Sequence, residues 1–153
     1  MRILVDIFSN YALLSAAAAW ILAQLIKIII DLVTMKRINF RLLMSSGGMP
    51  SSHSATVCAL ATSAGYIRGF RSLEFAMSFI FAFIVMYDAS GVRRAAGEQA
   101  KILNRLVREL EEGKKINMQK QLKELIGHTP LEVMAGALMG IMIGIIFHIV
   151  FTL

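Results

Sequence analysis

Two histidines stand at the starts of apolar segments, among residues that suit a phosphate group. The first is His53, which ends the run Gly-Gly-Met-Pro-Ser-Ser-His (47–53). The first turn of a helix offers unpaired N–H groups and the positive end of the helix dipole, so main-chain atoms can hold an anion there. Ser51 and Ser52 add hydroxyl donors, and His53 can carry a proton near neutral pH. Gly48 permits the close main-chain approach that an anion site needs. The run indicates a phosphate site, although a serine-capped helix that binds nothing has the same pattern.

The second histidine, His128, lies in the run Gly-His-Thr-Pro-Leu-Glu (127–132). Thr129 fits the N-cap of a helix, Pro130 fits its first position, and Glu132 completes a capping box. This cap leaves His128 unexplained. Glu132 could instead accept a hydrogen bond from the His128 ring and fix its tautomer, so capping and orienting compete for one carboxylate. Two such histidines among basic residues favour phosphoryl transfer, in which one imidazole attacks phosphorus and the other protonates the leaving group.

The elements that position these residues are expected to be membrane helices. The chain has 153 residues and is 57% hydrophobic, and its mean hydropathy is +0.66, above what a soluble domain of this size carries. Runs 11–33 and 131–153 are long enough to cross a hydrocarbon core of about 30 Å, and runs 54–67 and 73–87 are shorter candidates. We therefore predict an all-α integral membrane bundle of about four transmembrane helices, forming a single membrane-embedded domain over 1–153.

The net charge of +6 is distributed unevenly along the chain. Most basic residues follow the first and third predicted helices, whereas the opposite side carries Arg2, Arg68 and Arg71. By the positive-inside rule the basic segments and both histidine motifs face the cytoplasm. Segment 92–126 combines charges with apolar residues at helical spacing, which predicts an amphipathic cytoplasmic helical segment. It either lies against anionic lipid headgroups or forms a solvated hairpin.

Cations for the phosphate are expected from three places. Arg93 and Arg94 follow the third predicted helix, and guanidinium groups bind phosphate in a bidentate way, unless the two only anchor the helix end. Lys27 lies one turn before Asp31 in the first predicted helix, so it either reaches the phosphate or extends to the membrane interface. Lys123 stands shortly before the second histidine motif. These four side chains are the candidate phosphate-binding cations.

Three blocks of the chain together carry a family resemblance. They are Gly-Gly-Met-Pro-Ser-Ser-His-Ser-Ala (47–55), Tyr-Asp-Ala-Ser-Gly-Val-Arg-Arg-Ala-Ala-Gly-Glu-Gln-Ala (87–100) and Leu-Lys-Glu-Leu-Ile-Gly-His-Thr-Pro-Leu-Glu-Val (122–133). They resemble the divergent type 2 phosphatidic acid phosphatase family, also described as acid phosphatase/vanadium-dependent haloperoxidase-related. The resemblance covers nearly the whole chain. It implies an all-helical membrane protein that hydrolyses a phosphomonoester, expected to be a lipid phosphate, with no metal and no other cofactor.

The resemblance also implies roles for individual residues. It implies His128 as the nucleophile, His53 as the general acid, and Glu132 in the place of an orienting aspartate. Ser51 corresponds to a phosphate ligand in the Pro-Ser-Gly-His motif of the wider superfamily. The chain departs from that superfamily where arginines are expected, because Leu122 stands six residues before the second histidine and no Lys and Arg-Pro motif precedes the first. The phosphate-binding cations must therefore come from elsewhere in the chain.

We therefore expect a metal-independent lipid phosphatase of the cell membrane that acts through a phosphohistidine and has its site on the cytoplasmic side. The expected partners are membrane lipids and a phosphorylated lipid substrate, with no nucleic acid, and the sequence leaves a homo-oligomer open. A second hypothesis is a non-catalytic membrane protein that binds a phospholipid or acts as a scaffold. A third is a divalent-metal phosphatase that uses Asp88, Glu98 and Glu132, which predicts magnesium dependence.

Overall fold

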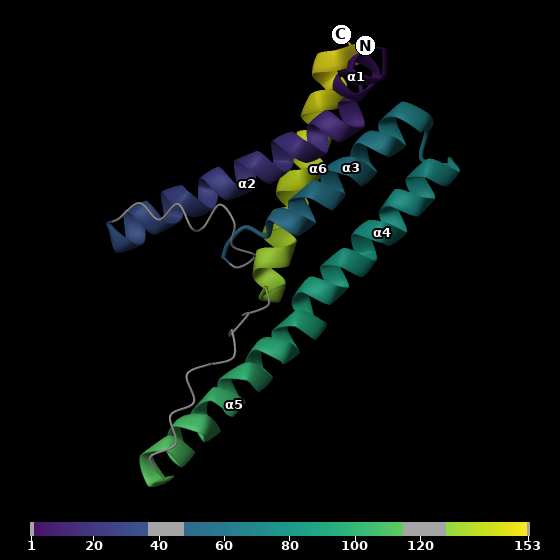
Figure 1. Ribbon diagram of the computed structural model, residues 1–153. Coiled ribbons are helices and arrows are strands. Elements are labelled where there is room, and N and C mark those ends of the chain that lie inside the picture. The colour runs from purple at the N-terminus through teal and green to yellow at the C-terminus, as the bar shows by residue number, and fades with distance from the viewer. Residues whose placement is uncertain (1, 37–47, 115–127, 153) are drawn as a thin grey trace.

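The computed structural model describes residues 2–36, 48–114 and 128–152, and every regular element in these ranges is a helix (Figure 1). The helices are α1 (Arg2–Phe8), α2 (Tyr11–Met35), α3 (Ser52–Arg68), α4 (Leu73–Ser90), α5 (Val92–Lys114) and α6 (Pro130–Thr152). The prediction of an all-α bundle is confirmed.

Side-chain caps and glycines define where the helices begin and end. Asn10 and Ser72 cap α2 and α4 by accepting hydrogen bonds from the main chain of the first turn, at 3.1 Å in each case. Gly69, with φ of +89°, ends α3 in a conformation that residues with a side chain rarely adopt. Gly91 separates α4 from α5, which continues in nearly the same direction beyond the other helices (Figure 1).

Helix α3 lies at the centre of the bundle and packs against α2, α4 and α6 (Figure 1). Its small side chains allow this, because alanines such as Ala55 and Ala59 have no exposed surface at all. Helices α2 and α6 also contact each other, and the start of α2 lies beside the end of α6 (Figure 1). There the rings of Tyr11 and Phe151 stack with centroids 5.4 Å apart. The starts of α3 and α6 therefore lie together at the opposite end of the bundle, where Lys27 of α2 contacts the start of α3.

A stripe of three glycines on α6 sets how closely this helix approaches α3. A side chain at Gly136 would collide with the main-chain carbonyl of Ser51, and one at Gly140 with that of Ala55. Spacing of four residues keeps such glycines on one helix face, as in close helix pairs within membranes. The two backbones are thus in direct contact, and this contact fixes the start of α3 beside the start of α6.

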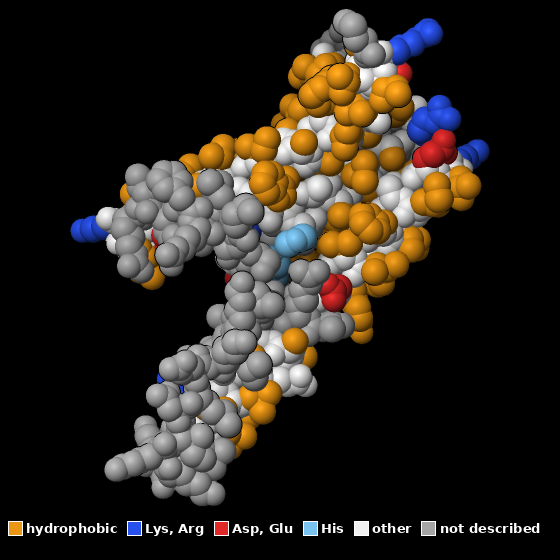
Figure 2. Space-filling model, viewed as in Figure 1, with side chains coloured by type: hydrophobic (Ala, Val, Ile, Leu, Met, Phe, Trp, Pro, Cys, Tyr) orange, Lys and Arg blue, Asp and Glu red, His pale blue; other side chains and the backbone are white. Residues whose placement is uncertain are grey.

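Three helical stretches among the described residues are long and apolar enough to cross a membrane, namely Tyr11–Met35, Leu73–Arg108 and Pro130–Phe151. Large hydrophobic side chains cover the visible outer face of the bundle (Figure 2). Helix α3 does not belong to this set, because its 17 residues cover only about 25 Å and it is rich in serine and threonine. It corresponds to run 54–67, the second of the four predicted helices, and it packs between the longer helices α2, α4 and α6.

Candidate active site

The start of α3 is a buried cluster of serines. Ser51 is the N-cap, and its Oγ accepts hydrogen bonds from the Ser54 N–H at 3.4 Å and the Ser54 hydroxyl at 3.0 Å. Ser51, Ser52 and Ser54 are at most 1% exposed. The preceding Gly48 has a φ of +89°, which accounts for a glycine at this position. The helix N-terminus predicted from the sequence is therefore present, and it lies inside the bundle rather than on its surface.

His128 is held at the start of α6 by both its main chain and its ring. The residue is 3% exposed, and its N–H donates to the carbonyl of Ala89 in α4 at 3.0 Å. Its Nδ1 lies 2.9 Å from Glu132 Oε2, and the same oxygen accepts from the Thr129 N–H at 3.2 Å. The Glu132 N–H donates in turn to the Thr129 hydroxyl at 3.3 Å, which completes the capping box. One oxygen of Glu132 thus accepts hydrogen bonds from both the helix cap and the His128 ring, the two roles that the sequence left as alternatives.

The other ring nitrogen of His128 is left available. Its Nε2 is buried and has no hydrogen-bond partner within the described part of the chain. A carboxylate at Nδ1 favours the tautomer with the proton on Nδ1, and then Nε2 carries a free lone pair. The ring of the half-buried His53 lies 6.3 Å away, centroid to centroid, at an interplanar angle of 61°. The two histidines are 75 residues apart in the sequence, and the fold brings them into one site.

A second hydrogen bond between main-chain groups ties the two histidine motifs together directly. The N–H of Ser51 donates to the carbonyl of Glu132 at 3.0 Å, so the cap of α3 is bonded to the first turn of α6. Together with the glycine stripe, this bond fixes the distance between the starts of the two helices. Side-chain rotamers then determine only the final orientation of the rings.

Lys27 brings a cation into this cluster from α2. The residue is 3% exposed, and its Nζ donates to the Ser52 hydroxyl at 3.3 Å. Gly48 lies against the lysine stem, since a side-chain carbon built at this glycine would be 3.8 Å from Lys27 Cδ. The ammonium group also interacts electrostatically with the carboxylate of Glu132. Of the two alternatives for Lys27, the structure thus has the side chain directed into the bundle beside the α3 start.

The side chains of the remaining predicted cations lie outside the described structure. Arg93 and Arg94 lie in the first turn of α5, but the described structure does not extend to their side chains, and Lys123 lies outside the described residues. His148 lies near the other end of α6, where its ring stacks on that of Tyr66 with centroids 4.4 Å apart.

The metal hypothesis concerns residues that the structure describes only in part. Asp88 lies near the end of α4 and is half-buried, whereas the side chain of Glu98 is not described. Among the described residues there is no group of three or more His, Cys, Asp or Glu side chains that could hold a metal ion. The carboxylate of Glu132 is engaged by His128 and Thr129.

One feature of the site was missed by sequence reasoning. It is the glycine stripe, Gly136, Gly140 and Gly144, whose four-residue spacing in an apolar helix was the available signal. Asp31 was noted beside Lys27 in the sequence but given no role in the site; it lies in the last turns of α2 and has a buried Oδ2. A carboxylate within a membrane-spanning helix is itself a functional signal, but its surroundings depend on how α2 packs.

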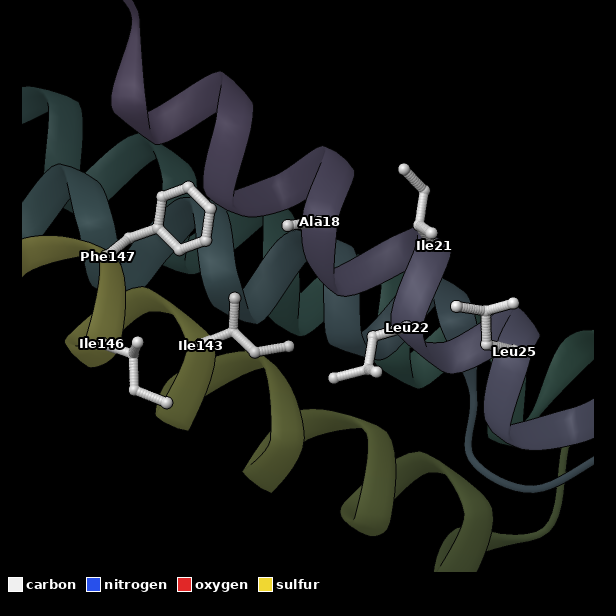
Figure 3. A pocket seen from close by; sticks show the side chains of 7 residues that line it. All are labelled: Ala18, Ile21, Leu22, Leu25, Ile143, Ile146 and Phe147. Carbon is white, nitrogen blue, oxygen red and sulfur yellow. The ribbon is translucent and has the colours of Figure 1, made fainter. Parts of the chain in front are cut away.

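An apolar groove lies between α2 and α6 on the outside of the bundle (Figure 3). It encloses about 370 Å³, and its wall on α2 reaches Leu25, two residues before Lys27. The residues that line it are all hydrophobic: Ala18, Ile21, Leu22, Leu25, Ile143, Ile146 and Phe147. The groove therefore offers a hydrocarbon surface on the same helices that carry Lys27 and Glu132.

Comparison with known proteins supports the family resemblance. The chain matches the model of the divergent PAP2 family over residues 8–143, a range that includes both histidine motifs. It is 46% identical to the uncharacterized membrane protein YuiD of Bacillus subtilis (strain 168), in an alignment that covers 92% of this chain and 96% of that protein. No solved structure matches the chain.

Proposed function

Because the chain belongs to the divergent PAP2 family, we propose that it is a membrane phosphatase that hydrolyses a lipid phosphomonoester through a phosphohistidine. One observation carries this proposal. The ring of His128 is bonded to Glu132 through Nδ1 at 2.9 Å, while its buried Nε2 has no partner among the described residues. A buried polar atom without a partner is rare, and an oriented imidazole with a free lone pair is what nucleophilic catalysis needs.

The residues around His128 support a two-step reaction. In the first step the Nε2 lone pair of His128 attacks phosphorus, and the ester P–O bond breaks as His53 gives a proton to the leaving alkoxide. The new P–N bond is then broken by water, whose proton passes to His53, and inorganic phosphate leaves. Glu132 stabilises the positive charge that develops on the His128 ring, since its carboxylate accepts from Nδ1.

Charge on the phosphoryl oxygens needs donors that are already in place. Lys27 supplies a cation at the α3 start, and the N-terminus of α3 supplies the positive end of its dipole. The hydroxyl groups of Ser51 and Ser52 lie at the same helix start. Gly48 keeps the chain close to Lys27. We assign these four residues to phosphate binding, and Arg93, Arg94 and Lys123 remain candidates for the same role.

Two observations support a lipid substrate approached from the cytoplasmic side. The apolar groove between α2 and α6 can accommodate a hydrocarbon chain on the outer face of the bundle (Figure 3). The helix ends that form the site are joined by the segments that hold most basic residues of the chain, and such segments face the cytoplasm by the positive-inside rule. The substrate is therefore a phosphorylated lipid of the surrounding membrane.

The test is phosphate release by purified protein from a phospholipid monoester in the presence of EDTA. We expect turnover without added metal and inhibition by vanadate, which mimics the phosphoryl group in transfer. His128→Ala should lower kcat by about a thousandfold or more, because it removes the nucleophile. His148→Ala is the matched control, since it removes a histidine near the far end of α6, the helix that His128 precedes, and should change kcat by no more than about twofold.

Full activity in the His128→Ala variant would contradict the proposal. Tight lipid binding with no turnover across a broad panel of monoesters would instead favour the binding or scaffold hypothesis. Activity that is strictly dependent on magnesium and lost with chelator would favour the metal hypothesis.

A further inference from the structure

Asp31 is a carboxylate in a membrane helix that the proposed reaction does not use. It lies one turn after Lys27 in α2, a spacing at which the two side chains commonly pair. They do not form an ion pair within the described structure, because the Lys27 ammonium is directed to Ser52. The Oδ2 atom of Asp31 is buried, and no described residue donates a hydrogen bond to it. Such an acceptor is costly in a membrane protein, so a ligand is its natural partner.

A cavity of about 250 Å³ lies beside this carboxylate. Its walls come from the last turns of α2 and from Gly48 and Met49, just before α3. Thr34 also lines it, but its hydroxyl already donates to the carbonyl of Ile30 at 2.7 Å. Asp31 is thus the wall residue with an unused acceptor, and the other walls are largely apolar.

The cavity adjoins the phosphate site through one shared side chain. Lys27 lines the cavity, and its Nζ bonds Ser52 at the start of α3. Residues one helical turn apart have Cβ atoms about 5 to 6 Å from each other. The cavity that Asp31 lines and the proposed phosphate site therefore share the Lys27 side chain.

Resting on the proposed function, we infer that this cavity receives the part of the substrate next to the phosphate ester. Asp31 then selects substrates that carry a hydrogen-bond donor there, either a hydroxyl or an ammonium group. The apolar walls suit the carbon atoms between that donor and the lipid chain. A substrate without the donor leaves the buried carboxylate oxygen unpaired, and sites of this kind discriminate strongly against such analogues.

The experiment measures binding, so that it does not depend on turnover. Three non-hydrolysable phosphonate analogues of one single-chain glycerophospholipid are compared on the purified full-length protein in detergent. They carry a 2-hydroxyl, a 2-amino group or a 2-deoxy carbon and are otherwise identical. The wild type should bind the hydroxyl or the amino analogue about 10- to 100-fold more tightly than the deoxy analogue. Whichever of the two binds more tightly identifies the source of the donor.

Variants test whether Asp31 is responsible. Asp31→Ala should abolish the preference by weakening the binding of the donor analogues while leaving the deoxy analogue within about twofold. Asp31→Asn keeps the side-chain volume, so it guards against misfolding, and it should reduce the preference for the amino analogue most because the negative charge is lost. Thr34→Val is the matched control, since it removes a hydroxyl that is already bonded within α2 and should keep the preference.

The inference is overturned if the preference is unchanged in both Asp31 variants. It is also overturned if the wild type shows no preference among the analogues or binds none of them. Failure of the proposed function is recognised separately. In that case the donor preference and its loss in the Asp31 variants persist, but the wild type releases no phosphate from any hydrolysable ester.

Discussion

Buried polar side chains occur in both halves of the bundle, but only one half contains buried side-chain atoms of the proposed sites without a hydrogen-bond partner in the described residues. In the half near the chain termini, Ser15 of α2 and Ser63 of α3 are hydrogen-bonded to each other at 2.7 Å and fully or almost fully buried. In the other half, His128 Nε2 and Asp31 Oδ2 are buried without a partner in the described ranges. Paired groups are part of the packing, whereas unpaired buried groups indicate where a ligand completes the structure.

The largest expected effect comes from Glu132→Gln. A neutral amide no longer stabilises the His128 imidazolium, and its NH₂ group can donate to Nδ1 and select the wrong tautomer. We expect kcat to fall by about a thousandfold with little change in lipid binding. Phosphate release and phosphonate binding measured on the same preparation check this. Unchanged kcat would show that the unpaired Nε2 does not depend on Glu132 for its function.

Thr129→Ala is the control for that prediction, because Glu132 also belongs to a capping box. This variant removes the cap hydroxyl that accepts from the Glu132 N–H and leaves the bond to His128 in place. It should cost about 1 kcal/mol of folding stability and change kcat by no more than about threefold. An equal loss of activity in both variants would assign Glu132 to capping alone.

A smaller effect is expected from Lys27→Met, which replaces a buried cation with an apolar side chain of similar length. The KM for a lipid phosphate should rise by about 10- to 100-fold, because a charged donor to the phosphate is lost. Folding stability should stay the same or increase, since a buried charge is removed from the membrane region. Steady-state kinetics and thermal unfolding in detergent measure both. Lower stability with an unchanged KM would assign Lys27 to the packing instead.

The smallest effect is expected in the other half of the bundle. Ser15→Ala should lower the free energy of unfolding by about 1 kcal/mol, since the buried Ser63 hydroxyl loses its bond to Ser15. Ser63→Ala should lower it by less, because the Ser15 hydroxyl still donates to the carbonyl of Ala12 at 2.9 Å. The double variant should be less destabilised than the sum of the two single variants, because no polar group is left unpaired. Activity should not change in any of the three. A loss of activity in these serine variants would contradict the distinction between paired groups that serve packing and unpaired groups that bind a ligand.

Local patterns in the sequence predicted much of the site. The serine cap at Ser51, the capping box at Thr129 and Glu132, and Pro130 in the first helical position all follow from short-range rules, and the structure confirms them. Gly48 has the positive φ that its place before α3 suggested. These features depend on a few neighbouring residues, so the chain alone is sufficient to predict them.

Features that depend on packing could not be predicted in the same way. Whether Lys27 turns inward or extends to the interface depends on the position of α3 beside α2. Its hydrogen-bond partner, Ser52, is 25 residues away in the sequence. The separation of the two histidine rings likewise depends on the contact between α3 and α6. That contact is set by Gly136 and Gly140, which contribute no chemistry of their own.

The main-chain bonds at the site have an evolutionary consequence. The N–H of Ser51 bonds the carbonyl of Glu132, and the N–H of His128 bonds the carbonyl of Ala89, so three helices are joined by groups that every residue other than proline possesses. Substitutions at the accepting positions leave these carbonyls in place. The relative position of the two histidine motifs therefore depends on the path of the backbone and not on the side chains at the accepting positions. A change in which side chains bind phosphate, such as the use of Lys27 that we propose, then requires no movement of either imidazole.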